Sequence, residues 1–537
     1  MILRQYPSKK EFSQLALDYN VIPVCAEILA DTETPVSILE KCHYSNDKAL
    51  FLLESVEGAE HWARYSFMGL SAKSHVKVFA DHISVDDKNI KHHGEPLNVL
   101  KEIASKYKPA DIKELPRFWS GLTGYMTYEM VSFFEAVPSM LPENSPYAHF
   151  IIPDAMVIFD NMNHTLTCMS ISYIEKPDEV KDSANQEEYI NGYYEKACKH
   201  LKELINLISE PTPKREYNQV FTQSDSDKST FLLTPETDRE TYIEGVKKIK
   251  EHIVAGDIIQ AVYSQPFSSN LPVDPLMLYR AQRYINPSPY MFFMNLGDIA
   301  IAGSSPETMV RLENRTATLR PIAGTRARGK NEQEDRALAD ELLNDEKERA
   351  EHLMLVDLGR NDLGRVAEVG TVQVTDLMFV ERYSHVMHLV SNITCEVKKE
   401  FDAWDLLKAT FPAGTLSGAP KIRAMEIIAD MEKKARGIYG GAAGYISFSG
   451  NMDLAITIRT ATIKRDLTDA KGDKGQFYGK MRVQAGAGIV FDSDPEKEHQ
   501  ECVNKAKSVE RAFRLAMLNS QQSKEALKDG KGDIKSC

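Results

Sequence analysis

The chain has 537 residues, which at roughly 150 residues per domain suggests two to four domains, and its 42% hydrophobic and 27% charged residues are typical of a soluble globular protein. Its 65 basic and 78 acidic side chains give a net charge of −13, which argues against a general nucleic-acid or anionic-membrane surface. Seven cysteines lack CxxC spacing, residues 1–24 lack a signal-peptide layout, and no apolar run approaches about 18 residues, so we expect a cytoplasmic protein without disulfides, a zinc site or a membrane span.

The first region, residues 1–208, mixes strands with one long helix. Hydrophobic and polar residues alternate over 75–80, which predicts a strand. Residues 187–208 predict a helix, whose apolar stripe comprises Tyr193, Ala197, Leu201, Leu204 and Leu207. Residues 209–236 are rich in Pro, Ser, Thr, Asp and Lys, which predicts a connecting segment with room for a strand or two.

The second region, residues 237–518, opens with a predicted helix over 239–255. Thr237-Asp238 is suited to cap this helix, and Gly256 to end it. Glycine-rich motifs crowd the rest of the region, so we expect the chemistry there, and 519–537 form a polar C-terminal tail. The whole pattern predicts an α/β fold of the α+β type, with large antiparallel sheets packed against helices.

Two predicted helices begin with glutamates three positions apart. Glu348 and Glu351 share one helical face. In the other helix, Glu498 extends an apolar stripe and Glu501 flanks it. A carboxylate on an inward face is costly unless a cation compensates it, and Mg²⁺ binds one or two carboxylates together with water and substrate oxygens. The same spacing is also common where glutamates merely interact with the helix dipole and surface cations.

Two glycine motifs offer backbone N–H groups to an anion. They are PIAGTRARG at 321–329 and GAG at 486–488, and each is equally compatible with a plain tight turn. The loop 411–423 suits either an anion at a helix N-terminus or simple capping. His388 lies in an apolar run, where it is either a core residue or a base in a dry pocket.

Taken together, these segments resemble the chorismate-utilising enzymes, and among them the anthranilate synthase component I family. The resemblance covers most of the chain and is densest over 252–513. Its motifs occur in family order: GDIIQ (256–260), GSSPE (303–307), PIAGTRARG (321–329), EHLMLVDLGRND (351–362), GTLSGAPKIRAMEI (414–427), YGGAAGY (439–445), IRT (458–460) and GAGIV (486–490).

The resemblance implies roles for individual residues. Glu351 and Glu501 would bind Mg²⁺, supported by Glu348 and Glu498. The groups that hold the chorismate carboxylates would be Gly324, Thr325, Tyr439, Arg459, Gly486, Ala487 and Gly488. Glu307 would protonate the departing 4-hydroxyl as ammonia attacks the ring. His388, with Thr415 nearby, would take the ring proton while pyruvate leaves.

Two positions choose among members of the family. The aminodeoxychorismate synthases have a nucleophilic lysine where this chain has Ala323. The isochorismate and salicylate synthases have a lysine base where this chain has Gln260. Both departures favour the first committed step of tryptophan biosynthesis, which yields anthranilate and pyruvate. An aminodeoxychorismate synthase component I that has lost its lysine and a catalytically inactive, tryptophan-sensing homologue stay open as alternatives.

The resemblance also implies feedback inhibition and a partner. The segments LLES (52–55) and NPSPYM (286–291) resemble a tryptophan site formed by Ser55, Pro289, Tyr290 and Met291, although alone they would fit a strand end and a proline-rich turn. No cysteine lies in a GxCxG-type turn, so ammonia would come from a separate glutamine amidotransferase subunit (component II). We therefore expect a hetero-oligomer.

Overall fold

The computed structural model describes residues 1–43, 50–55, 64–86, 88–175, 183–212, 232–383, 386–465 and 480–518. The polar tail predicted at 519–537 and most of the connecting segment predicted at 209–236 lie outside these ranges.

The helices are α1 (Lys9–Leu15), α2 (Pro35–His43), α3 (Pro96–Ser105), α4 (Ser183–Ser209), α6 (Arg239–Val254), α7 (Pro275–Ile285), α8 (Glu332–Asn344), α9 (Glu346–Gly364), α10 (Ala403–Thr410), α11 (Lys421–Met431) and α12 (Pro495–Leu518), with short 3₁₀ turns η1 (Tyr128–Phe133) and η2 (Gly414–Leu416). The strands of the first region are β1 (Ile2–Tyr6), β2 (Val21–Leu29), β3 (Leu50–Glu54), β4 (Tyr65–Val78), β5 (His82–Val85), β6 (Lys88–Lys91), β7 (Gly121–Met126), β8 (Ala148–Asp160) and β9 (Thr165–Tyr173). Those that follow are β10 (Thr234–Pro235), β11 (Gln260–Ser269), β12 (Tyr290–Asn295), β13 (Ile299–Ser305), β14 (Thr308–Glu313), β15 (Thr316–Leu319), β16 (Ile322–Ala327), β17 (Gln373–Arg382), β18 (Val386–Glu396), β19 (Gly418–Ala419), β20 (Ala442–Ser447), β21 (Met452–Ile456), β22 (Thr460–Lys464) and β23 (Met481–Ile489).

The structure confirms the two helices predicted on either side of the connecting segment. Helix α4 covers the predicted 187–208 and starts four residues earlier. Asp238 caps α6 by accepting the N–H of Thr241 at 2.8 Å, and Gly256, with φ of +83°, follows the end of the helix. The alternation at 75–80 belongs to β4, which ends at Val78.

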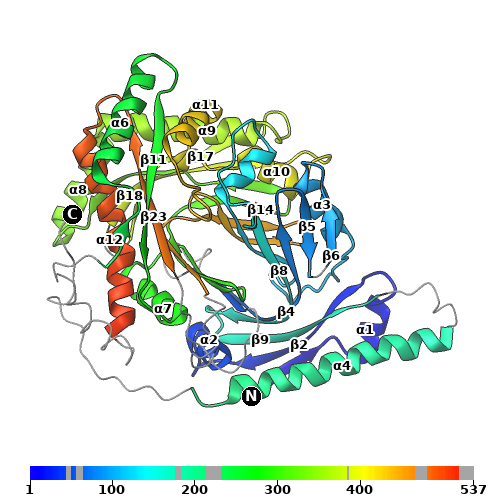
Figure 1. Ribbon diagram of the computed structural model, residues 1–537. Helices are drawn as coiled ribbons and strands as arrows, with labels where there is room; N and C mark the ends of the chain where they lie inside the picture. The colour runs from blue at the N-terminus through cyan, green and yellow to red at the C-terminus, as the bar shows by residue number, and fades with distance from the viewer. Residues whose placement is uncertain are drawn as a thin grey trace.

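The strands pair in antiparallel fashion, which confirms the predicted fold class. The long strands β11 and β23 pair along their length, and α6 and α12 run beside them (Figure 1). Helix α4 lies beneath β2 and β9 at the opposite end of the molecule (Figure 1). The fold is thus built from antiparallel sheet covered by helices.

Strands of the first region pair directly with strands of the second. Glu54 of β3 is opposite Met291 of β12, and Gly124 of β7 is opposite Gly444 of β20. The β3–β12 pairing joins the two segments that the sequence assigns to one inhibitor site.

Helix α12 packs on β23 and α7 through the apolar stripe that its sequence predicts. Cys502, Ala506, Val509, Phe513 and Ala516 are all buried. This anchoring fixes the position of the first turns, where Glu498 extends the same stripe and Glu501 flanks it. Among the described residues, no helix is both long and apolar enough to cross a membrane.

Candidate active site

Two helices far apart in the sequence bring glutamates toward one another. Asp345 fixes the start of α9 by accepting the N–H groups of Lys347 and Glu348. Burial raises the pKa of Glu351, and the carboxylates of Glu348 and of Glu501 on α12 raise it further. The charge of Glu501 on α12 therefore acts on Glu351 of α9.

This donor set fits a divalent cation held only in part by protein. Burial raises the pKa of Glu498, and so does the charge of Glu501, whereas Lys347 and Lys505 oppose the rise without cancelling it. Among the described residues, no group of three or more His, Cys, Asp or Glu side chains is arranged to hold a metal ion. Mg²⁺ commonly binds one or two carboxylates and completes its shell with water and substrate. The residues present therefore fit an open magnesium site and not a closed protein cage.

Lys505 lies beside these carboxylates, and no sequence motif pointed to it. Its ammonium forms a 2.8 Å ion pair with Glu501 and donates a 2.9 Å hydrogen bond to the carbonyl of Gly486. The available signal was its position four residues after Glu501, which puts both on one face of α12. Lys505 thus links the acidic helix to the glycine motif.

The GAG motif forms part of a strand, although its sequence predicts a turn. Residues 486–488 lie within β23, because β11 pairs with them throughout. A Cβ on Gly486 would lie 2.8 Å from Tyr439 Oη, and one on Gly488 would lie 2.5 Å from Gln260 Nε2. At Gly486 a side chain would also lie 2.9 Å from the Tyr263 carbonyl oxygen, so glycine is required there, whereas at Gly488 only the end of the Gln260 side chain would have to move.

The PIAGTRARG motif places Gly324 between the acidic helix and His388. Gly324 has φ of +63° at a register shift between β16 and β18, a conformation suited to glycine. A Cβ there would lie 3.2 Å from Glu348 Oε2. The Gly324 carbonyl and the Thr325 hydroxyl are each 3.0 Å from His388 Nδ1.

These bonds determine which nitrogen of His388 is free. A carbonyl can only accept, so Nδ1 donates to Gly324, and Nε2 of the neutral ring keeps its lone pair. Burial lowers the pKa of His388, the bond to Gly324 opposes this change, and Arg459 adds to it. A neutral imidazole with a free Nε2 is the form that can accept a proton.

Glu307 follows β13 and has the features of a proton donor. Burial raises the pKa of its carboxyl, while the Thr415 hydrogen bond, Arg459 and Lys505 oppose that rise. Thr415 Oγ1 donates to Glu307 Oε2 at 2.8 Å. The family resemblance implies that Thr415 is near His388, whereas the structure shows its hydroxyl bonded to Glu307.

Arg459 brings a positive charge close to Glu307. Its backbone has φ of +48°, and its carbonyl accepts a 3.3 Å hydrogen bond from Gln282 Nε2. Burial lowers the pKa of Arg459, and Glu307 opposes that effect. Within the part of the chain that the structure describes, no side chain hydrogen-bonds to its guanidinium, which can therefore bind an incoming carboxylate.

A separate cavity lies where β3 meets β12. The four residues expected at a tryptophan site all line it: Ser55, Pro289, Tyr290 and Met291. Tyr290 Oη donates a 2.9 Å hydrogen bond to Asp453, which also pairs with Arg117 at 3.2 Å. Arg117 and Asp453 come from distant segments without a recognisable motif, so only the folded sheet reveals their presence.

The chain matches the family model described as "chorismate binding enzyme" over residues 55–511. It is 42% identical to "Anthranilate synthase component 1" of Aquifex aeolicus, over 96% of this chain and 99% of that protein. It is 43% identical to the protein of the same name from Pseudomonas putida, over 96% and 99% of the two chains. The crystal structure of anthranilate synthase component I from Streptococcus pneumoniae superposes with a TM-score of 0.68 at 36% identity, covering 85% of this chain and 93% of that one.

Proposed function

The chain belongs to the family of chorismate binding enzymes, and on that premise we propose that it converts chorismate and ammonia to anthranilate and pyruvate, as the chorismate-converting component of an anthranilate synthase. Relatives that cover nearly its full length support this lyase activity. One observation carries the choice within the family: Ala323, on β16, has a methyl group where a lysine nucleophile would be needed to form aminodeoxychorismate.

Binding of chorismate, a dicarboxylate, would use the cationic and glycine-rich parts of the site. Arg459 supplies a guanidinium, Tyr439 a hydroxyl, and Gly324 and Thr325 a bend with a polar side chain. The strand of Gly486, Ala487 and Gly488 provides a narrow floor. Glu351 and Glu501 would hold Mg²⁺, with Glu348 and Glu498 in support, and the ion when bound neutralises and orients a substrate carboxylate.

The proton transfers follow from the states of Glu307 and His388. Glu307, with its raised pKa, keeps a proton that it gives to the 4-hydroxyl leaving as water while ammonia forms the new carbon–nitrogen bond. His388 Nε2 then takes the ring proton as the bond between the ring carbon and the enolpyruvyl oxygen breaks, and the ring becomes aromatic. The released enolpyruvate gains a proton at its methylene carbon to become pyruvate. Thr415 orients the acid.

Three further parts of the proposal concern regulation, supply and location. The cavity lined by Ser55, Pro289, Tyr290 and Met291 would bind tryptophan as feedback inhibitor. Ammonia would come from glutamine through a separate amidotransferase subunit, in keeping with the "component 1" in the relatives' names, which makes a hetero-oligomer. Biosynthetic relatives support a cytoplasmic location, as do the six cysteines among the described residues, which are free.

The deciding experiment is incubation of the purified chain with chorismate, Mg²⁺ and ammonium at mildly alkaline pH. We expect a fluorescent product with the mass of anthranilate, together with pyruvate. Aminodeoxychorismate would favour the alternative member of the family, and no product would favour the inactive, tryptophan-sensing homologue. Turnover with glutamine in place of ammonium, by this chain alone, would contradict the separate-subunit part of the proposal.

A further inference from the structure

We infer that Arg436, held by Glu432, is a positioning residue for the reaction. Its guanidinium bonds to the backbone carbonyl of Leu416, next to Thr415, and to that of Val262 on β11, the strand that pairs with the glycines of β23. The inference rests on the proposed function, since it assigns Arg436 a role in that same site.

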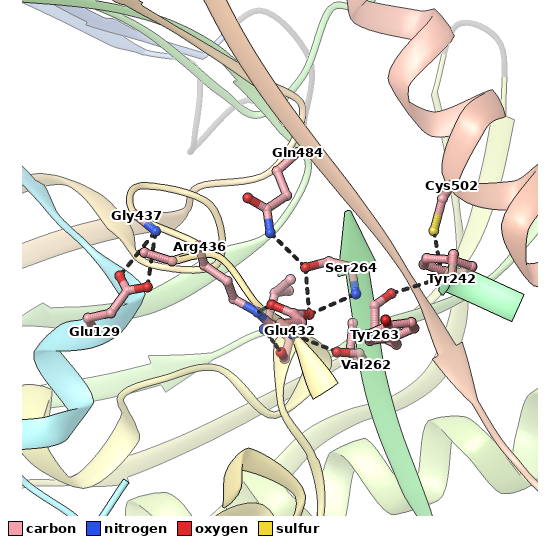
Figure 2. A network of polar contacts seen from close by, with 12 residues as sticks. Glu129, Tyr242, Val262, Tyr263, Ser264, Glu432, Arg436, Gly437, Gln484 and Cys502 are labelled. Carbon is pink, nitrogen blue, oxygen red and sulfur yellow. Dashed lines mark hydrogen bonds and ion pairs between the residues drawn. The ribbon is translucent and has the colours of Figure 1, made fainter. Parts of the chain in front are cut away.

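The two side chains form a buried ion pair at the end of α11. Glu432 is the residue that follows the helix, and the two side chains are 7% and 2% exposed. Arg436 Nε donates to Glu432 Oε2 at 2.8 Å, and Nη2 donates to Oε1 at 2.7 Å (Figure 2). This two-pronged geometry fixes the plane of the guanidinium.

The remaining donors of Arg436 reach two segments of the active site. Nη1 donates to the carbonyl of Leu416 at 2.6 Å, next to Thr415 in η2. Nη2 donates to the carbonyl of Val262 at 2.6 Å, and Val262 is opposite Gly488 in the β11–β23 ladder. One guanidinium therefore links the turn that carries Thr415 to β11, the strand that pairs with the glycine strand.

Glu432 bonds to the same strand, β11, two residues beyond Val262. Its Oε1 accepts from both the backbone N–H and the hydroxyl of Ser264, each at 2.8 Å (Figure 2). Ser264 is opposite Gly486, and Gln484 Nε2 donates to its hydroxyl at 2.8 Å. The carboxylate thus anchors β11 beside the glycines that form the floor of the site.

The loop between Arg436 and Tyr439 is tied down in the same way. The Arg436 guanidinium lies 5.8 Å from the centre of the Tyr439 ring and 4.4 Å from that of Tyr128. The N–H of Gly437 donates to Glu129, with the shorter distance 3.1 Å (Figure 2). Arg436 therefore contacts the substrate-binding tyrosine as well as the two segments above.

A role in stability alone does not explain this arrangement. Attraction within a buried ion pair roughly offsets the cost of desolvating both charges, and apolar residues of similar volume are often as stable. What an apolar pair cannot supply is a set of directed bonds to two separate backbone carbonyls. A matched pair exists at Glu510 and Arg514 of α12, also four residues apart, joined at 2.6 Å, and 6% and 10% exposed. It lies nine residues beyond Glu501, about 13 Å along the helix.

The test compares Arg436→Lys with Arg514→Lys, using kcat/KM for chorismate with ammonium at saturating Mg²⁺. Lysine keeps the positive charge but cannot make the two parallel hydrogen bonds of a guanidinium. We therefore expect kcat/KM of the Arg436 variant to fall by about 100-fold, the effect of displacing a catalytic group by roughly 1 Å. The alkaline limb of its pH profile should move to higher pH. Displacement of Thr415 from Glu307 removes a hydrogen bond that favours the ionised carboxylate, so the pKa of Glu307 should rise, while Arg459 and Lys505 stay in place. The Arg514 variant should have the same alkaline limb and the same kcat/KM as the wild type.

The double variant E432M/R436M guards against simple misfolding, because it leaves no unpaired buried charge. We expect it to match E510M/R514M in thermal midpoint and still to lose about 100-fold in kcat/KM. A folded E432M/R436M with activity near the wild type, or Arg436→Lys with an unmoved alkaline limb, would overturn the positioning role. Failure of the wild type to make anthranilate would instead remove the proposed function, and this inference with it.

Discussion

Thr415 donates a 2.8 Å hydrogen bond to Glu307, although 108 residues separate the two in the sequence. The bond orients the candidate acid, and because it favours the ionised carboxylate it also limits how far burial can raise the pKa of Glu307. Thr415 therefore affects the pH range in which Glu307 is protonated as well as the direction in which it points.

Replacement of Glu307 by Gln should abolish proton donation while keeping the shape of the side chain. We expect kcat to fall by about 10² to 10⁴-fold, with little change in KM for chorismate. Anthranilate fluorescence measured at several chorismate concentrations gives both constants. A Glu307→Gln enzyme with kcat close to that of the wild type would remove Glu307 from the mechanism.

Thr415→Val should move the alkaline limb of the kcat/KM profile to higher pH. Loss of the hydroxyl raises the pKa of Glu307, so the protonated acid persists further into the alkaline range. Thr375→Val on β17 is the control, since this threonine is exposed and its hydroxyl contacts Asp376. An alkaline limb that stays in place, or moves down, would contradict the assignment.

Glu351→Gln should weaken the dependence on Mg²⁺, because a neutral amide is a poorer ligand for this ion than a carboxylate. We expect the Mg²⁺ concentration for half-maximal activity to rise by about tenfold or more. Glu346→Gln removes an exposed charge from the first turn of the same helix and should leave that concentration unchanged. If the Mg²⁺ concentration for half-maximal activity rises equally in both variants, the cause is the loss of a negative charge in general, and Glu351 is not a ligand.

His388→Asn should lower kcat by about 10² to 10⁴-fold, because an amide cannot accept the ring proton. In the wild type, burial lowers the pKa of His388, so the ring stays neutral to a lower pH than an exposed histidine would. The acid limb of the kcat profile should consequently lie below about 6.5, the ordinary value for histidine. An acid limb above that value would mean that another group is the base.

Tyr290→Phe should weaken inhibition by tryptophan and leave uninhibited turnover intact. The hydroxyl anchors the cavity wall to Asp453 at 2.9 Å, and loss of one such bond corresponds to about 0.5–1.5 kcal/mol, or roughly 2- to 12-fold in the inhibitory concentration. Tyr284→Phe is the matched control, since Tyr284 is 75% exposed on α7. The inhibition curve is followed by fluorescence, and an unchanged curve for Tyr290→Phe would argue against tryptophan at this cavity.

Local sequence signals were sufficient for the helices α6 and α12. The cap at Asp238, the stop at Gly256 and the apolar stripe of α12 act within a few residues, so the sequence alone predicts α6 and α12. The GAG motif was different: its glycines predict a turn, but pairing with β11 holds them in a strand. The local preference of glycine for a turn is overridden where a neighbouring strand supplies backbone hydrogen bonds.

Partners that come from distant parts of the chain could not be predicted in the same way. The sequence gives no means of matching Thr415 with Glu307 or Arg117 with Asp453, because the two members of each pair meet only when distant segments fold together. Lys505 is intermediate: its spacing from Glu501 was visible, but its bond to Gly486 depends on how α12 packs on β23. Helical spacing indicates a shared face, whereas tertiary packing decides what that face contacts.

The ladders β3–β12 and β7–β20 run across the border between the first region and the second. A chain shortened to begin near residue 237 would leave the N–H and C=O groups of β12 and β20 bare along open edges, which are prone to self-association. Truncation is therefore a poor test of the proposed inhibitor site, because it would also break the sheet of the second region. Single replacements inside the intact sheet are the better test.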